Sequence, residues 1–163
     1  MPHVLLGVGA NLGNREAALQ SVVDAMRGPF TGIRASRVFS TPPWGVTDQP
    51  PFLNAVIAGE TELDPEQVLA FARECEAGAG RVRDRRWGPR TLDVDVIAYD
   101  DVRSDDPQLT LPHPRAHERA FVLVGIVDLD PGFLFPGFGS AASLLAALGA
   151  DGITPVGELR VAA

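Results

Sequence analysis

The chain has 163 residues, 45% of them hydrophobic and 21% charged, and a formal net charge of −7 at pH 7. This composition predicts one globular domain over residues 1–163. The acidic balance argues against a nucleic-acid-binding surface, and no apolar run approaches the roughly 20 residues of a membrane span. The N-terminus lacks signal-peptide features and the single cysteine, Cys75, suits a reducing compartment, so we expect a cytoplasmic protein, monomeric and without nucleic-acid or membrane partners.

Hydrophobic periodicity and helix-capping signals predict alternating strands and helices. Asn14 and Asp64 are typical N-caps, and Asp64 is followed by a proline at the first helical position and by Gln67 at the capping-box position. Strands are predicted at His3–Gly9, Ile33–Phe39, Phe52–Thr61 and within Arg90–Asp100, and a short extended piece at Leu109–Arg115. Helices are predicted from about Arg15 to Gly28-Pro29, from Pro65 to about Ala79, at Ala120–Leu129 and at Ser140–Leu148. This order, β-α-β-β-α-β followed by helical material, predicts an α+β fold: the ferredoxin-like sandwich, with an antiparallel sheet, helices on one face and additional C-terminal helices.

Two segments between the predicted elements stand out by composition. Ser40–Pro51, with four prolines and a glycine, is interpreted as a functional loop. The glycines of GVGANLG, Gly7 to Gly13, are interpreted as turn residues. Their GxGxxxG spacing, and the absence of an acidic residue at the end of the next strand, disfavour a dinucleotide-binding fold.

Two aspartates occupy alternate positions of the strand RTLDVDVIAYD. Asp93 and Asp95 alternate with Leu92, Val94 and Val96, so their side chains project from the same face, roughly 7 Å apart. Like charges this close are unfavourable unless water covers the face or a cation lies between them. Carboxylates at this spacing suit Mg²⁺, which shares its remaining ligand positions with water and with phosphates.

Arginines precede the aspartate pair. The chain has no lysine, and five of its 14 arginines lie between positions 81 and 90, at Arg81, Arg83, Arg85, Arg86 and Arg90. Guanidinium groups bind phosphate oxygens, and a metal ion beside them neutralises charge at the transition state of phosphoryl transfer. The sequence therefore predicts an anion site next to a cation site.

Aromatic side chains in or beside loops suggest a second substrate. Trp44, Phe52, Trp87 and Phe121 lie at such positions, and Asn54 shares a strand face with Phe52. An aromatic ring and an amide on one face can hold a flat heterocycle by stacking and hydrogen bonding.

Several stretches resemble those of the 6-hydroxymethyl-7,8-dihydropterin pyrophosphokinases of folate biosynthesis. The matching runs, in order along most of the chain, are GANLGNR, TPPWG, QPPFLNAV, GRVRDRRWGPRTLDVDVI and LTLPHPRAHERAFVL. The resemblance implies a ferredoxin-like fold and a reaction in which the hydroxymethyl oxygen of the pterin attacks the β-phosphorus of ATP and AMP is released. It also implies two Mg²⁺ ions bridged by Asp93 and Asp95.

The resemblance further implies roles for individual residues. Phe52 and Phe121 would sandwich the pterin and Trp87 would close over it, although Phe39 and Phe52 stand where tyrosine is common in the family. The implied pterin-binding residues are Thr41, Trp44, Phe52, Asn54, Trp87, Asp93 and Phe121; the implied ATP-binding residues are Glu76, Arg81, Trp87, Arg90, Thr110, His113 and Arg119; and the implied catalytic residues are Arg81, Arg90, Asp93 and Asp95.

The segment Gly80–Pro89 is expected to be a mobile lid. Its four arginines repel one another when no anion is bound, and Val82 and Trp87 are its only sizeable apolar side chains. Mg-ATP would supply the missing anions and a pterin would give Trp87 a surface to cover, so both ligands favour closure.

Two other functions remain open on the residues alone. A metal-dependent nucleotidyl transferase or cyclase also uses paired aspartates on an antiparallel sheet, but it would release diphosphate and not AMP. A ferredoxin-like regulatory module would bind a small ligand without Mg²⁺ and without turnover of ATP, because this fold hosts many functions.

Overall fold

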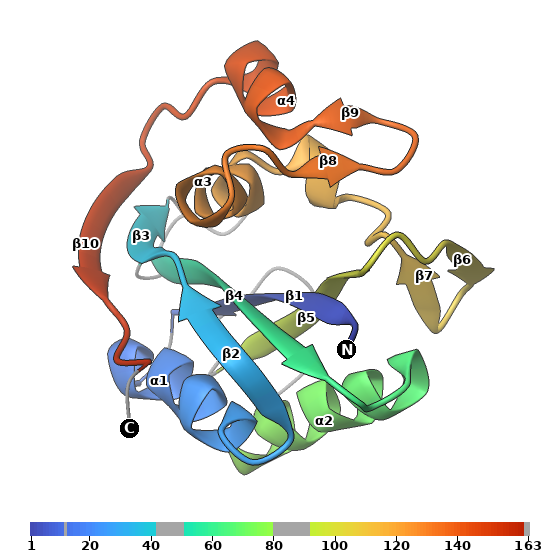
Figure 1. Cartoon of the computed structure of the whole chain (residues 1–163). Coiled ribbons are helices and arrows are strands. Elements are labelled where there is room, and N and C mark those ends of the chain that lie inside the picture. The colour runs from blue at the N-terminus through green and yellow to red at the C-terminus, as the bar shows by residue number, and fades with distance from the viewer. Residues whose placement is uncertain (12, 42–50, 80–91, 162–163) are drawn as a thin grey trace.

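The protein's structure, a computed structural model, describes residues 1–11, 13–41, 51–79 and 92–161 (Figure 1). Its elements are β1 His3–Ala10, α1 Arg15–Met26, β2 Phe30–Ala35, β3 Arg37–Thr41, β4 Phe52–Thr61, α2 Pro65–Gly78, β5 Asp93–Tyr99, β6 Ser104–Asp106, β7 Leu109–Leu111, the 3₁₀ turn η1 Ala116–Glu118, α3 Ala120–Leu129, β8 Leu134–Phe135, β9 Gly139–Ser140, α4 Ala141–Leu148 and β10 Thr154–Glu158. Among these helices, none combines the length and the apolar character that crossing a membrane requires.

One antiparallel sheet runs through the centre of the molecule. Its strand order is β10-β3-β4-β1-β5, and β2 also pairs with β4. With β2 and β3 counted as one interrupted strand, the chain follows the predicted order β1-α1-β2/β3-β4-α2-β5. The ferredoxin-like prediction is confirmed, with β10 added at one edge of the sheet (Figure 1).

The predicted strand Ile33–Phe39 is interrupted at Ser36. This residue is buried, and its backbone N–H donates to the Val56 carbonyl at 2.8 Å. The Ser36 hydroxyl accepts from the Val56 N–H at 2.9 Å and donates to the Arg37 carbonyl at 2.8 Å, so it replaces a ladder hydrogen bond at the break. The prediction of a continuous strand was wrong here, because the alternation of side chains does not show where a hydroxyl group takes the place of a backbone hydrogen-bond partner.

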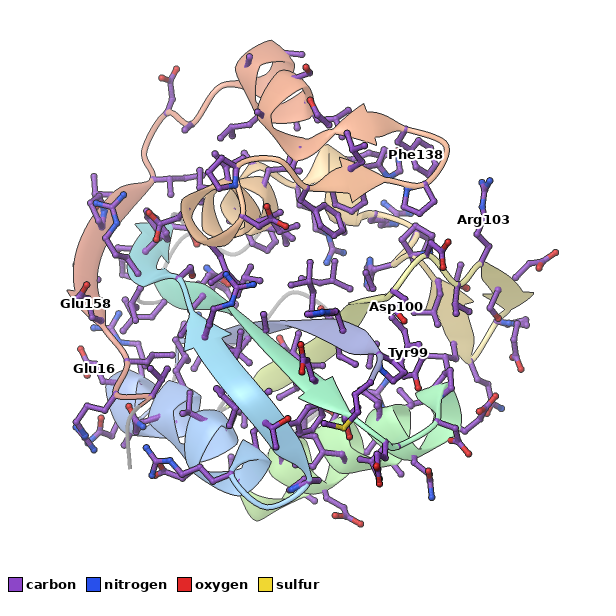
Figure 2. The ribbon with its side chains drawn as sticks, in the orientation of Figure 1. Glu16, Tyr99, Asp100, Arg103, Phe138 and Glu158 are labelled. Atoms are coloured by element: carbon purple, nitrogen blue, oxygen red, sulfur yellow. The ribbon has the colours of Figure 1, made fainter. Side chains whose placement is uncertain are left out.

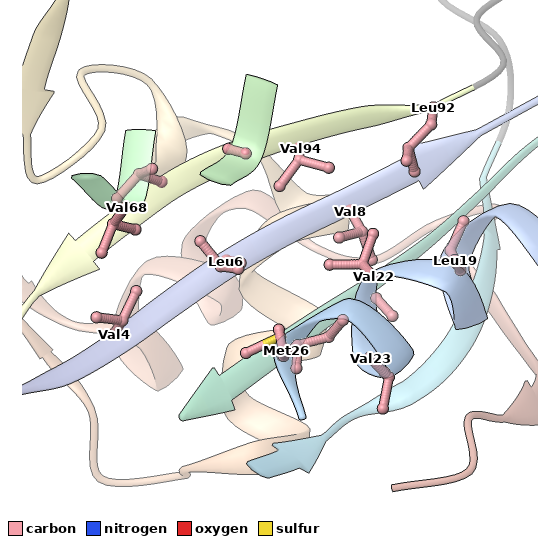
Figure 3. Packing of buried hydrophobic residues seen from close by; sticks show 14 of the residues in the cluster. Val4, Leu6, Val8, Leu19, Val22, Val23, Met26, Val68, Leu92 and Val94 are labelled. Carbon is pink, nitrogen blue, oxygen red and sulfur yellow. The ribbon is translucent and has the colours of Figure 1, made fainter. Parts of the chain in front are cut away.

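Helices cover both faces of the sheet (Figure 1). On one face, α1 and α2 enclose the larger core (Figure 3), whose buried side chains from β1 and α1 include Val4, Leu6, Val8, Leu19, Val22, Val23 and Met26. On the other face, α3 packs on β3 and β4, and α4 packs on α3. The second core there includes Val56, Ile97, Leu123 and Ile126. Each such aliphatic side chain contributes about 1.5–3 kcal/mol when fully buried.

Gly7 and Gly9 lie inside β1, so the interpretation of both as turn residues was wrong. The even-numbered residues of β1 point into the core beneath α1 and α2, which places the two glycines on the face that α3 also covers. Gly13 does fit the turn interpretation, because its φ of +70° lies in the left-handed region.

The short C-terminal strands were not predicted. β10 pairs with β3 from Thr154–Ser40 to Glu158–Arg37, and every residue of β10 is exposed. Its sequence, TPVGE, includes a proline and a glycine, and the pairing is irregular between them. A strand that is exposed on both faces has no hydrophobic alternation, so periodicity could not identify it.

The close packing of α3 on β4 predicts opposite outcomes for two helical glycines. Gly125→Ala should destabilise the protein by about 1–3 kcal/mol, the usual cost of overpacking, because the added Cβ would lie 2.6 Å from Val56 Cγ2 and 3.3 Å from Ser36 Oγ. In Gly78→Ala, the matched control in α2, the Cβ would meet nothing within 4 Å. That change should leave stability unchanged or raise it by up to about 1 kcal/mol.

Urea unfolding of the wild type and both variants measures these differences. An unchanged free energy of unfolding for Gly125→Ala would contradict the close approach of α3 to β4.

Candidate active site

Asp93 and Asp95 project from one face of β5, as their alternation predicts. In the register with β1, Asp93 pairs with Gly9 and Asp95 with Gly7, and both carboxylates are half-buried. Val94, between them, points into the core beneath α2. The two aspartates therefore lie on the α3 side of the sheet, next to positions of β1 that carry no side chain.

An irregularity in β5 directly follows the aspartate pair. The register with β1 shifts between Leu5 and Leu6, and Ile97 has no partner in it. The Ile97 carbonyl accepts a hydrogen bond from the His113 N–H at 2.8 Å. Bulges of this kind often lie beside active sites, where they redirect a side chain. Here the bulge brings the segment around His113 next to the strand that carries the aspartates.

Glu76 holds the outer edge of β5 between the two aspartates. The residue is 4% exposed, and its Oε2 accepts from the Val94 N–H at 2.9 Å. Its Oε1 accepts from Arg73 Nη1 at 3.0 Å. Because β5 is the last strand on its side of the sheet, the carboxylate satisfies a backbone donor that no further strand of the described sheet reaches. Glu76 thus links α2 to the backbone between Asp93 and Asp95.

The far end of β5 is tied to the start of β1. The His3 N–H donates to Asp100 Oδ1 at 2.7 Å, and the Asp100 N–H donates to the His3 carbonyl at 2.7 Å. The Tyr99 hydroxyl donates to the Leu63 carbonyl at 2.6 Å. Tyr99 and Asp100 mark this anchored end in Figure 2. β5 is therefore fixed at Val94, between the two aspartates, and at the end that follows them.

A buried amide lies in the same row of the sheet as Asp93. Asn54 on β4 and Asp93 on β5 both pair with Gly9 of β1, which lies between them. Asn54 Nδ2 donates to Thr41 Oγ1 at 2.8 Å, and both side chains are buried. Neighbouring strands lie about 4.8 Å apart, so the amide and the carboxylate arise from backbones roughly 10 Å apart. Sequence reasoning assigned Gly9 to a turn and did not place it at this site, because its pairing with Asn54 and Asp93 joins three strands that are far apart in the chain.

His113 is neutral at pH 7. Burial, together with the charges of Arg119 and Arg115, lowers the pKa of His113 to about 4. Its Nδ1 accepts from the Arg115 N–H at 3.2 Å, so the neutral ring carries its hydrogen on Nε2 and can donate there. The Arg119 guanidinium lies 5.8 Å from the centre of the Phe121 ring. This segment offers one neutral donor beside two permanent positive charges.

The remaining predicted residues of the described ranges surround this face less closely. Phe52 begins β4, where it pairs with Thr41, and Phe121 lies in the first turn of α3; both are half-buried. Among the described side chains, these two rings are not in contact with each other. Thr110 lies on β7, and its hydroxyl donates to the Asp106 carbonyl at 3.0 Å.

Several predicted site residues lie outside the described residues. These are Trp44, Arg81, Trp87 and Arg90, together with the expected lid Gly80–Pro89 and residues 42–50 of the expected functional loop Ser40–Pro51, whose first two residues end β3.

The aspartate pair is the part of this face that can hold a metal ion. Within the described ranges, no group of three or more His, Cys, Asp or Glu side chains converges as a metal site. Two carboxylates alone suit Mg²⁺, because this ion keeps several waters and takes further oxygen ligands from a bound phosphate. The donor set of Asp93 and Asp95 therefore fits the ion that the sequence predicts.

Comparison with known proteins identifies the family. Residues 5–131 match the family model of 7,8-dihydro-6-hydroxymethylpterin-pyrophosphokinase (HPPK). The chain belongs to the HPPK family. Two similar proteins, both named 2-amino-4-hydroxy-6-hydroxymethyldihydropteridine pyrophosphokinase, come from Methylorubrum extorquens, with 44% identity over 84% of this chain and 88% of that protein, and from Pseudomonas aeruginosa, with 40% identity over 93% of this chain and 94% of that protein.

Solved structures agree with the fold. The crystal structure of Plasmodium falciparum HPPK-DHPS wild type with pteroate matches 90% of this chain with a TM-score of 0.70 and 12% sequence identity. This chain spans 44% of the length of that HPPK-DHPS chain. At this identity the likeness concerns the fold alone, and it agrees with the ferredoxin-like sheet of this family member.

The contact of Glu76 with β5 predicts a loss of stability on truncation. Glu76→Ala should lower the free energy of unfolding by about 1–3 kcal/mol, because it leaves the buried Val94 N–H without an acceptor. Glu74→Ala is the control on the same helix, where the side chain is exposed, and it should change stability by less than about 0.5 kcal/mol. Urea unfolding of both variants measures the difference, and equal stabilities would contradict an anchoring role for Glu76.

The low pKa of His113 predicts a pH-dependent stability. Between its ordinary value of 6.5 and the folded value of about 4, the unfolded chain binds more protons, so stability should fall as the pH is lowered through this range. His113→Gln should remove this part of the dependence. Urea unfolding at about pH 7 and about pH 5 tests it, since these values bracket part of the range. The same loss of stability in both proteins would contradict a neutral, half-buried His113.

Proposed function

We propose that the chain transfers diphosphate from ATP to the hydroxymethyl group of 6-hydroxymethyl-7,8-dihydropterin and releases AMP, as a step of folate biosynthesis. Membership of the HPPK family supports this reaction. The observation that carries it in the structure is the row Asn54–Gly9–Asp93, in which an amide suited to a heterocycle and a carboxylate suited to a metal-bound phosphate lie on one face of the sheet.

The pterin would bind on the β4 side of this row. The Asn54 amide uses one N–H on Thr41 and retains a second N–H and its carbonyl oxygen, a donor next to an acceptor that fits the edge of a pterin ring. Phe52 and Phe121 are proposed to stack on the two faces of the ring, because they come from β4 and α3, which pack on each other. Trp44 and Trp87 are proposed to complete this site.

ATP would bind on the β5 side. Arg119 supplies a fixed positive charge, and neutral His113 donates from Nε2, so the phosphates meet both a charge and a directional donor. Thr110 and Glu76 are proposed to lie at the edge of the nucleotide site, where they reach it from β7 and α2. Arg81, Trp87 and Arg90 are proposed to contact ATP from the segment before β5, Arg81 and Arg90 as catalytic residues.

Asp93 and Asp95 are proposed to hold two Mg²⁺ ions between the sheet and the triphosphate. When bound, these ions supply charge neutralisation at the phosphates. The pterin hydroxyl oxygen then attacks the β-phosphorus, the bond from that phosphorus to the oxygen bridging the α-phosphate breaks, and AMP departs with this oxygen while the hydroxyl proton passes to solvent. Orientation and charge, more than proton transfer, would lower the barrier.

The organisation of the enzyme completes the proposal. We propose that residues 1–163 act as one pyrophosphokinase domain, because β1 and β10 belong to the same sheet. We further propose that the enzyme works as a cytoplasmic monomer.

The identity of the products tests the proposed reaction. Protein incubated with Mg-ATP and 6-hydroxymethyl-7,8-dihydropterin should form AMP and the pterin diphosphate in equal amounts. Release of inorganic diphosphate would instead indicate a nucleotidyl transferase, and tight ligand binding with no turnover would indicate a regulatory module.

The metal assignment predicts the effect of two isosteric changes. Asp93→Asn and Asp95→Asn should each lower the rate of AMP formation by roughly 100-fold or more, since each keeps the side-chain shape but removes a charge from the metal site. Asp101→Asn, at an exposed position just after β5, is the control and should retain the wild-type rate. Circular dichroism checks that all three variants fold. Near-normal rates in either site variant at ordinary Mg²⁺ concentrations would exclude the assignment.

A further inference from the structure

We infer that Gly9 is a positioning residue that sets where the Asn54 amide stands relative to Asp93, and so determines pterin affinity and alignment. This inference rests on the proposed function. It comes from a contact within the sheet: a Cβ built on Gly9 would lie 2.6 Å from Asn54 Oδ1 and 3.6 Å from Asn54 Cγ. The amide of β4 therefore occupies the space that a side chain of β1 would take.

The Asn54 amide is held in this place from its other end. Its Nδ2 donates to Thr41 Oγ1 at 2.8 Å, and Asn54 and Thr41 are only 8% and 5% exposed. Rotation of the amide away from Gly9 would break this hydrogen bond and leave buried polar groups unpaired. A methyl group on Gly9 would thus force a choice between a clash and the loss of the contact with Thr41.

The contact between Gly9 and the Asn54 amide matters for the proposed site because of where Gly9 lies in the strand register. Gly9 pairs with Asn54 on one side and with Asp93 on the other, so the amide that overlies Gly9 extends across β1 toward β5. Under the proposed function, the amide orients the pterin and Asp93 orients the phosphates. A displacement of the amide by even an ångström would shift the hydroxymethyl oxygen relative to the β-phosphorus, and catalysis is sensitive to shifts of that size.

Gly7 provides a matched control on the same strand and the same face. A Cβ on Gly7 would meet Ile97 Cδ1 at 3.1 Å, the far end of a flexible side chain, and no polar group within 4 Å. Gly7 pairs with Asp95 and Val56, so Gly7→Ala adds the same methyl group to the same face, two residues away from the position beside the amide.

Calorimetry on the wild type, Gly9→Ala and Gly7→Ala tests the inference. Each protein is titrated with a non-hydrolysable ATP analogue and Mg²⁺, and then with 6-hydroxymethyl-7,8-dihydropterin. Gly9→Ala should bind the pterin about tenfold more weakly or worse, the effect of one lost hydrogen bond, and should bind the ATP analogue as the wild type does. Gly7→Ala should keep wild-type pterin affinity. Wild-type pterin affinity in Gly9→Ala, or an equal loss for both ligands, would overturn the inference.

Two further measurements separate this inference from the proposed reaction and from misfolding. In ligand-free protein, the side-chain NH₂ resonances of Asn54 should move in Gly9→Ala and stay in place in Gly7→Ala, whatever the protein catalyses; unmoved resonances in Gly9→Ala overturn the inference. Absence of AMP formation by the wild type would refute the proposed reaction alone.

In an Asn54→Ser background, Gly9→Ala should cause no further loss of thermal stability, because the clashing amide is gone. If Gly9→Ala lowers the thermal stability as much in the Asn54→Ser background as in the wild type, Gly9 acts through another contact.

Discussion

The candidate site depends on the register of β1 between β4 and β5. A strand shifted by one residue would exchange its two faces, placing Val8 or Ala10 between Asn54 and Asp93 and turning the glycines toward the core. The buried side chains of β1 beneath α1 exclude that slip, because they would lose a core that contributes several kcal/mol. The paired hydrogen bonds between His3 and Asp100 fix the same register at the end of the strand. Hydrophobic packing on one face therefore decides the chemistry that the opposite face can present.

Because β5 lies at an edge of the described sheet, one of its backbone N–H groups needs a hydrogen-bond acceptor, and α2 supplies it. An edge strand leaves backbone donors unpaired, and here one of them lies between two carboxylates. Glu76 satisfies it from the last turns of α2, where its carboxylate accepts from the backbone N–H of Val94. Arg73 contributes a counter-charge to Glu76 at 3.0 Å. This arrangement couples the packing of a helix to the geometry of a strand that has one neighbour among the described strands, so Glu76 supports the backbone between the two aspartates from the other side.

Sequence reasoning reached the features that follow a simple period and missed those that depend on contacts between distant segments. The alternation around Asp93 and Asp95 was enough to place both on one face, because strand geometry alone dictates it. The sequence could not show that Gly9 lies between Asn54 and Asp93, since that follows from the pairing of three strands far apart in the chain. The break at Ser36 was missed for the same reason, because it depends on hydrogen bonds with Val56 of another strand, whereas the exposed strand β10 was missed because it has no hydrophobic alternation. The low pKa of His113 likewise depends on its burial against the β5 bulge.

The charges of the candidate site are divided between the two sides of the β5 bulge. Asp93 and Asp95 precede the bulge. Arg115 and Arg119 follow His113, whose N–H donates to the Ile97 carbonyl in the bulge. Burial lowers the pKa of His113 and the two arginines lower it further, so the same positive field that would attract a triphosphate helps to keep the imidazole uncharged. A neutral ring loses less hydration on burial than a charged one and still donates from Nε2. In the candidate site, the arginines thus supply the permanent positive charge, and His113 supplies a hydrogen-bond donor with a fixed direction. An acidic protein can in this way present a local anion site without burying an additional cation that titrates.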